Sequence, residues 1–442
     1  MDYSLIDFFS HPVFRAATLG SLFVGVSSAL VGSILLVQRR SLLGEALSHA
    51  AYPGLLLAPF LLGVLPFIPR AALPVVALIG AFVFTGGGFH AVSQCERKLR
   101  MSSDAALSLV SALFLGLGVT MASRVQFAYP LESQRLQTLL YGQVATMTEK
   151  EGALYACFAV VCACFIIVYF RQLEMALFDR ACALQRGEPG RLMHTLFVAM
   201  LLLTVVFGAK TVGIVLLSGM LIAPAVAARQ LTDRLGRLMI FAACLGALST
   251  LSGHLLALYL PLWLGREVAL PTGPMMVLVA TALCGLALFF APKRGVVVRL
   301  VRIISFRFHC LRENLIKALW KARKPLPLMT LRGLIGAEGG LGLRWHVRQL
   351  IRQGWVVREE KDIYRLTSLG AKKAAQLVRL HRLWELYLTS ELHIHQDRVH
   401  RSAEEMEHIL TPEIERKLTH LLNNPQTDPH SQPIPQWEDL QC

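Results

Sequence analysis

Histidine and glutamate residues recur at helical spacing near the carboxyl-terminal end of this chain. Residues three or four positions apart lie on one face of an α-helix. Imidazole and carboxylate groups together suit Fe²⁺, Mn²⁺ or Zn²⁺, and such pairs recur in di-metal proteins. Charged surface helices also produce this spacing by chance, but its recurrence in two successive segments favours a metal site. The candidate ligands are His381, Glu385, His400, Glu404, Glu407 and His408.

A second pair of these residue types, Glu45 and His49, falls in an apolar stretch of the chain. Ionisable residues inside a membrane are costly, so they usually serve a function. This pair is therefore a candidate for contact with a divalent metal in transit; a capping or interhelical hydrogen bond is the alternative. His90 and His254 also lie at or near apolar stretches, where a lone histidine more often packs than binds a metal.

Two different kinds of domain must position these candidates. Residues 14–292 hold nearly all of the long apolar runs, whereas residues 293–442 have the composition of a charged soluble domain. Because a spanning helix needs about 20 mainly apolar residues, the sequence predicts a polytopic all-α membrane bundle of about nine spans. The predicted spans are 14–36, 45–66, 71–90, 105–122, 152–170, 192–208, 212–228, 238–260 and 274–292.

Lysine and arginine residues gather in alternate loops of this predicted bundle. The positive-inside rule places those loops in the cytoplasm, so the N-terminus is expected outside and residues 293–442 inside. Small residues, as in Gly20–Gly32 and Gly208–Gly219, let helices approach closely. They favour a transporter or channel over a tethered enzyme. Met1–His11 lacks the basic start of a secretory signal peptide.

Three segments of the apolar half, Gln38–Gly54, Val212–Arg229 and Pro271–Pro274, resemble the permease subunits of manganese, zinc and iron ABC importers. The resemblance covers about residues 10–295. It implies a bacterial inner-membrane protein whose partners are a second permease subunit, a cytoplasmic ATPase and a periplasmic metal-binding protein. Because the chain has no Walker A pattern, it is expected not to be an enzyme, and ATP hydrolysis is expected on a separate chain.

The resemblance also bears on two sites in the permease half. The loop Leu173–Gly190 is expected to dock on the ATPase through Phe178, Asp179 and Arg180, although a solvated loop is the alternative. The family usually has Asp at the position of Glu45, so the carboxylate here lies about one methylene further from the backbone.

The soluble half begins with the pattern of a winged helix-turn-helix. Helices are expected over 314–322, 331–337 and 343–353, and a β-hairpin is expected from 355–358 and 363–366. The third helix would present basic side chains to DNA phosphates and base edges. Winged helices also serve as protein-docking modules, which is the alternative. The candidate DNA contacts are Arg344, His346, Arg348 and Arg352.

Further segments resemble the iron- and manganese-dependent repressors of the diphtheria-toxin repressor family, over about residues 310–435. The family resemblance implies a metal-dependent homodimer that binds operator DNA. The segments are Leu366–Gly370, His381–Glu385, Val399–His408 and Thr427–Pro435.

The same resemblance sorts the candidate ligands into two sites. Manganese-type members have Glu at the position of Glu404, where iron-type members often have Cys. Glu404 thus leans away from a thiolate site but does not settle the metal. Fe²⁺ or Mn²⁺ is favoured, with Zn²⁺ as an alternative. One site takes His381, Glu385 and His400, and the other takes Glu404, Glu407 and His408.

Two departures from the repressor family concern its ends. The family's usual Met or Asp ligand before the first helix is replaced here by Arg312–Asn314. Glu313, Asn314 or the nearby His309 is a candidate substitute. The SH3-like domain that follows in the family is expected to be absent.

The sequence thus predicts a permease domain (1–292), a basic linker (293–312), a winged-helix domain (313–370) and a helical metal-binding and dimerisation domain (371–442). The expected function is an importer subunit that carries its own metal-dependent repressor of uptake genes. Because a tethered repressor reaches only DNA near the membrane, the basic, weakly structured stretch Pro292–Arg312 is expected to be cut in the cell. A membrane-bound metal sensor that no longer transports is the alternative.

Overall fold

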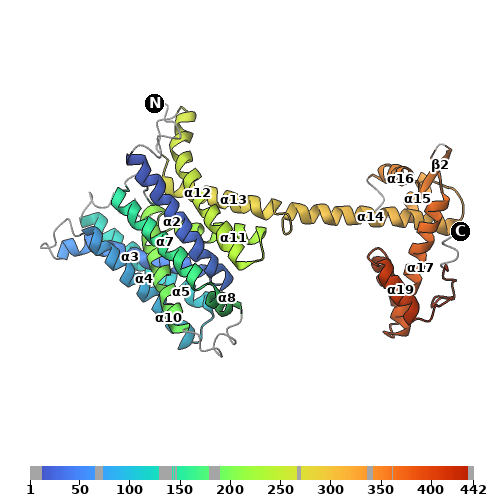
Figure 1. Ribbon diagram of the computed structural model, residues 1–442, viewed down its shortest axis with the longest axis horizontal. Helices are drawn as coiled ribbons and strands as arrows, with labels where there is room; N and C mark the ends of the chain where they lie inside the picture. The colour runs from blue at the N-terminus through green and yellow to red at the C-terminus, as the bar shows by residue number, and fades with distance from the viewer. Residues whose placement is uncertain are drawn as a thin grey trace. The chain divides into compact units, whose positions relative to one another are not determined.

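The computed structural model describes residues 12–64, 73–128, 142, 144, 147–178, 190–265, 270–335, 342–360 and 362–436. The chain divides into two compact units, Met1–Val298 and Arg299–Cys442, and each is described by itself. Figure 1 labels most of the helices of both units and strand β2.

The first unit is built from helices, in agreement with the predicted polytopic α-helical architecture. Each predicted span overlaps one of them. Among the described residues, α2, α4, α5, α7, α10, α12 and α13 have the length and hydropathy to cross a membrane, and α11 is a shorter apolar helix. The helices are α2 (Pro12–Val37), α3 (Leu42–Val64), α4 (Leu73–Arg97), α5 (Ser103–Ala128), α7 (Glu149–Val168), α8 (Phe170–Phe178), α10 (Gly190–Thr211), α11 (Leu217–Leu231), α12 (Leu235–Trp263) and α13 (Thr272–Phe290).

Small residues set how closely these helices approach. Helix α2 packs against α7, α11 and α12, and α3 packs against α4 and α5. Where α2 crosses α12, a Cβ added to Gly246 would lie 2.5 Å from the carbonyl oxygen of Gly25. Gly54 and Gly80 make the same kind of contact between α3 and α4. Glycine is therefore required at these crossings, because any side chain would push the two backbones apart.

Ion pairs lie at both ends of the bundle and link helix ends and the connections between helices on each side. The pairs at the first end lie where the sequence predicts the cytoplasmic end of the bundle. The remaining pairs lie at the opposite end of the bundle. They join the start of α7 to the start of α2 and to the end of α10. The pairs at the first end are Arg40–Glu96 and Arg294–Asp233, and those at the second are Arg15–Glu149 and Lys210–Glu151.

The second unit combines helices with a small three-stranded antiparallel sheet of order β1-β3-β2. Leu326 pairs with Tyr364, and Val356 pairs with Leu366. Its core includes Leu315, Leu350 and Tyr364. The elements are α14 (Val296–Ala322), β1 (Leu326–Pro327), α15 (Leu328–Ile335), α16 (Leu343–Arg352), β2 (Val356–Glu360), β3 (Ile363–Leu366), α17 (Ser368–Ser390), α18 (Gln396–Met406) and α19 (Pro412–Leu421).

Helix α14 corrects the expectation of a weakly structured linker over Pro292–Arg312. Residues 296–322 form one α-helix, because this run contains neither glycine nor proline and is rich in leucine, arginine and lysine. The first half of α14 is exposed, whereas Leu315 and Ile316 in its second half are buried in the core of the second unit. Cleavage of this stretch stays a prediction, and a protease would have to open the helix.

We expect Gly246→Ala to destabilise the helix bundle by about 1–3 kcal/mol, the range for overpacking a close-packed interior. The added methyl group would collide with the backbone of Gly25. Thermal unfolding of the purified full-length protein in detergent measures the effect. Gly285→Ala on α13, where no neighbouring atom lies within 4 Å, is the matched control and should unfold like the wild type. Equal stability of the two variants would contradict the proposed contact.

Candidate metal centre

Two helices bring His381, Glu385 and His400 together. Helix α17 carries the first two one turn apart, and α18, which packs against α17, carries the third. His400 Nδ1 lies 2.8 Å from Glu385 Oε1, and His381 Nε2 lies 3.2 Å from both of these atoms. Ligand atoms bound about 2.0–2.2 Å from one ion lie about 3–3.5 Å apart. Among the described residues, this is the one group of three such side chains arranged to hold a metal ion.

The three side chains line a cavity of about 160 Å³. Glu385 is buried, whereas the side chain of His400 is 55% exposed, so an ion can reach the group from solvent. Asp428 and His430 line the same cavity. Sequence reasoning placed these two residues in a family segment but did not assign them to the site.

The charges of the group suit a divalent cation. Burial favours the neutral form of Glu385, but hydrogen bonds and charges from His381 and His400 outweigh it and lower the pKa of Glu385 to about 2. Burial likewise favours neutral His381, but hydrogen bonds with Glu385 and Glu407 outweigh it and raise the pKa of His381. A metal ion that binds here therefore meets an ionised carboxylate and competes with protons for His381.

The structure does not bring Glu404, Glu407 and His408 together as a second ligand set. Helix α18 ends at Met406, so Glu407 and His408 lie in the turn that follows it. Glu404 is exposed, and its carboxylate lies 3.8 Å from His400. The Glu407 side chain is fully buried and contacts His381 at 2.6 Å. His408 Nε2 lies 3.6 Å from Glu407 Oε1, so these two residues remain neighbours, but the partner of Glu404 is His400.

His408 instead contacts Glu313 on α14, whose carboxylate oxygen lies 2.7 Å from His408 Nδ1. Glu313 is buried, and His309 and Lys373 lie 3.4 and 3.6 Å from its other oxygen. Two of the three candidate substitutes for the family's first-helix ligand thus lie in this group. Sequence reasoning missed Lys317, which lies one turn after Glu313 and contacts Glu407. The available signal was a lysine one helical turn from an acidic residue on a buried helix.

The predicted transport-path pair lies in the first turns of α3. Glu45 Oε1 and His49 Nε2 are 3.9 Å apart, and the Glu45 side chain is 49% exposed. Among the described residues, the pair belongs to no group of three metal-binding side chains. His254 is buried in α12. Phe178 is exposed at the end of α8, whereas Asp179 and Arg180 lie outside the described residues.

The predicted DNA contacts divide into exposed and buried residues. Arg344, Arg348 and Arg352 are exposed on α16. His346 is only 1% exposed, and its ring packs on Phe308 and Trp345 with centroid distances of 4.8 and 4.9 Å. The prediction that His346 contacts DNA is therefore corrected, because its side chain faces the interior.

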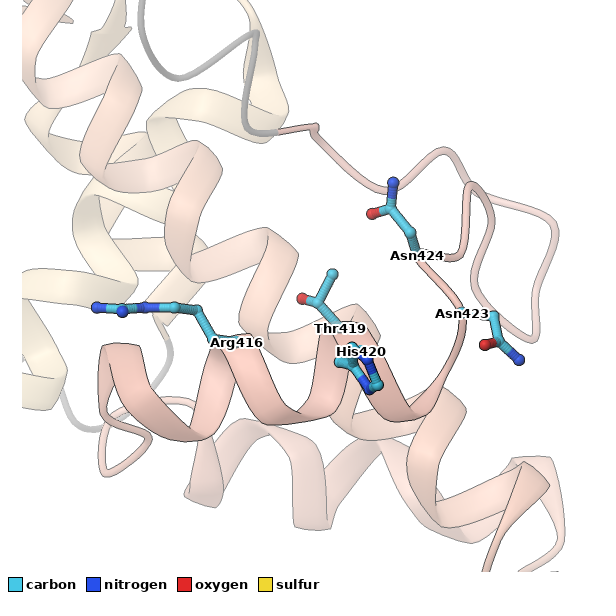
Figure 2. Close-up of a pocket in the computed structure, with 5 residues that line it drawn as sticks. All are labelled: Arg416, Thr419, His420, Asn423 and Asn424. Carbon is cyan, nitrogen blue, oxygen red and sulfur yellow. The ribbon is translucent and has the colours of Figure 1, made fainter.

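A larger hollow of about 380 Å³ lies at the end of α19. Figure 2 shows Arg416, Thr419 and His420 on that helix, with Asn423 and Asn424 in the segment that follows. The lining offers one imidazole and no carboxylate, so it does not suit a divalent metal.

Comparison with known proteins assigns both halves. Residues 10–291 match the ABC 3 transport family. Residues 367–436 match the domain described as iron dependent repressor, metal binding and dimerisation domain. The chain therefore belongs to the ABC 3 transport family and carries an iron-dependent-repressor domain after its permease part.

Similar proteins cover either nearly the whole chain or about two thirds of it. A probable metal transport system membrane protein of Chlamydia pneumoniae is 37% identical over 444 residues, which span 97% of this chain and 98% of the relative. The zinc transport system membrane protein TroC of Treponema pallidum is 32% identical over 300 residues, 68% of this chain and 96% of the relative. The solved structure of PsaBC from Streptococcus pneumoniae in complex with Fab is 25% identical, with a TM-score of 0.54, and the match covers 67% of this chain and 98% of that one.

We expect Mn²⁺ to slow amide hydrogen exchange in α17 and α18 of the full-length protein, because one ion would join the two helices. Ligand at about 100 times its Kd stabilises the bound form by about 2.7 kcal/mol. Glu385→Gln removes the carboxylate charge and should abolish the slowing. Glu391→Gln, at the exposed end of the same helix, is the control. Slowing that survives in Glu385→Gln would contradict this site.

Proposed function

We propose that this chain is the transmembrane subunit of an ATP-driven divalent metal importer of the bacterial inner membrane, and that its second unit is a metal-dependent repressor of uptake genes. The observation that carries the regulatory half is the convergence of His381, Glu385 and His400 in one cavity. The transport half is supported by its family and by relatives named for metal, zinc and manganese transport.

In the transport half, α3 and α11 complete a bundle of nine spans with the N-terminus outside. The ATPase is a separate cytoplasmic chain, and the segment Phe178–Arg180 docks on it. A second permease subunit completes the pore, and a periplasmic metal-binding protein delivers the ion. Glu45 and His49 contact the ion on its way through.

In the regulatory half, α15 and α16 form the helix-turn-helix, and β2 and β3 form the wing. Helix α16 enters the major groove of operator DNA, where Arg344, Arg348 and Arg352 contact phosphates and base edges. The regulator acts as a homodimer, as its dimerisation domain supports. Fe²⁺ or Mn²⁺ is the favoured metal, and Zn²⁺ is the alternative.

The structure supports a direct route from the metal group to the DNA-binding elements. Helix α17 follows β3 after Thr367, whose backbone N–H donates to Trp355 O at 3.0 Å. The hydroxyl of Thr367 donates to Gly354 O at 2.6 Å, and it also accepts from the N–H of Gly370. A Cβ on Gly370 would collide with the backbone of Trp355. Metal that fixes α17 therefore also fixes the base of the wing.

We expect full-length protein in nanodiscs to bind DNA from its own promoter region at least about tenfold more tightly with one of Fe²⁺, Mn²⁺ or Zn²⁺ than without metal, under anaerobic conditions. His381→Ala should lose this gain because a ligand is missing. Arg348→Gln should bind metal normally but bind DNA weakly. Glu391→Gln is the control. DNA binding that is indifferent to metal would contradict the regulatory function.

Transport is separable from regulation by a second experiment. We expect Glu45→Ala and His49→Ala to lower uptake of radiolabelled metal in cells by about tenfold or more, since a path ligand is lost. Protein abundance at the membrane is the control, measured by immunoblotting. Unchanged uptake in both variants would favour the alternative, a membrane-bound metal sensor that no longer transports.

A further inference from the structure

A lysine lies beside Glu407, one of the residues expected to bind a second metal ion. Lys317 on α14 is buried, with 9% of its side chain exposed, and Glu407 is fully buried. Lys317 Nζ lies 2.5 Å from Glu407 Oε1, and Glu407 Oε2 lies 2.6 Å from His381 Nδ1. Both carboxylate oxygens of Glu407 are therefore engaged by groups of the chain itself.

The surroundings of Glu407 are already balanced in charge. Its buried neighbour Glu313 has Lys373 at 3.6 Å, in addition to His408 and His309. An ammonium group has three donors and no lone pair for a metal, so a divalent ion near Glu407 would meet a cation that cannot ligate it. A buried carboxylate needs a compensating charge, and Lys317 supplies it.

The surroundings of Glu385 are different. The described partners of its carboxylate are the imidazoles of His381 and His400, which are metal ligands when neutral. Glu407 has a second effect on this group, because its contact with His381 Nδ1 leaves Nε2 directed at Glu385 and His400. Carboxylates that hold the remote nitrogen of a metal-binding histidine in this way fix its tautomer and orientation.

We propose that the regulatory unit binds one metal ion per chain, at His381, Glu385 and His400, and that the ammonium group of Lys317 takes the place of a second ion. Glu407 is then a positioning residue for His381 and not a ligand. This inference rests on the proposed function and specifies its metal stoichiometry. It also departs from the two ligand sets that the family resemblance implies.

Metal content of the full-length protein tests the stoichiometry. Protein in detergent is dialysed against Mn²⁺, desalted and measured by mass spectrometry of manganese, and ions per chain are counted. The quadruple variant in which His381, Glu385, Glu407 and His408 are all replaced by alanine gives the number held by the permease half, which is subtracted. The wild type should then hold one ion in the regulatory unit.

Two single variants separate the roles of Glu407 and Lys317. Glu407→Gln should keep one ion but bind it about 10–100-fold more weakly, the usual loss when the partner of a metal-binding histidine is removed. Lys317→Gln should raise the count from one to two, because it frees Oε1 of Glu407, which also lies 3.6 Å from His408 Nε2, and leaves the charge of Glu407 uncompensated. Lys417→Gln, an exposed lysine paired with Glu413 on α19, is the control and should keep one ion.

The possible counts have different meanings. Two ions in the wild type, one of which is lost in Glu407→Gln, would overturn this inference and leave the proposed regulator intact. No ion in the regulatory unit would overturn both. Lys317→Gln could fail to fold, so exchange in α17 is checked first; the wild-type and Glu407→Gln counts decide the inference without it.

Discussion

The buried carboxylate of Glu407 is the constraint on which the regulatory unit depends. Lys317 reaches it from α14 and His381 reaches it from α17, while Glu407 itself follows α18. One buried charge thus ties three helices together, because it is stable only if its partners stay in place. The same contact turns the free nitrogen of His381 toward Glu385 and His400. The contacts of Glu407 therefore both hold the helices together and orient His381 for metal binding.

The membrane unit depends on a different constraint, the absence of side chains where backbones cross. Gly25 on α2 and Gly246 on α12 touch through main-chain atoms, and Gly54 and Gly80 do the same between α3 and α4. Lipid tails are as apolar as the helix surfaces, so the hydrophobic effect does not select which helices pack together. Close backbone contacts of this kind determine which helices become neighbours. Ion pairs then join neighbouring helices and their connections at both ends of the bundle.

The sequence predicted what depends on local pattern, and missed what depends on partners far along the chain. Apolar runs and family segments placed the helical bundle and the repressor domain. Helical spacing brought out His381 and Glu385, but it also grouped Glu404 with Glu407, since the end of α18 at Met406 is not visible in the spacing. Basic composition suggested a linker where α14 is helical. Lys317 lies one turn after Glu313, which was a local signal, but its contact with Glu407, 90 positions away, could not be read from the spacing.

In the proposed regulatory site, two imidazoles and one carboxylate hold the metal. Pulsed EPR of Mn²⁺ bound to the full-length protein, with all histidines labelled by ¹⁵N, tests this assignment most directly. We predict coupling of the Mn²⁺ spin to histidine nitrogens that becomes markedly weaker when His381 and His400 are both replaced by alanine, with the remainder coming from metal held at His49. A spectrum unchanged by that double replacement would contradict it, because the metal would then be bound elsewhere.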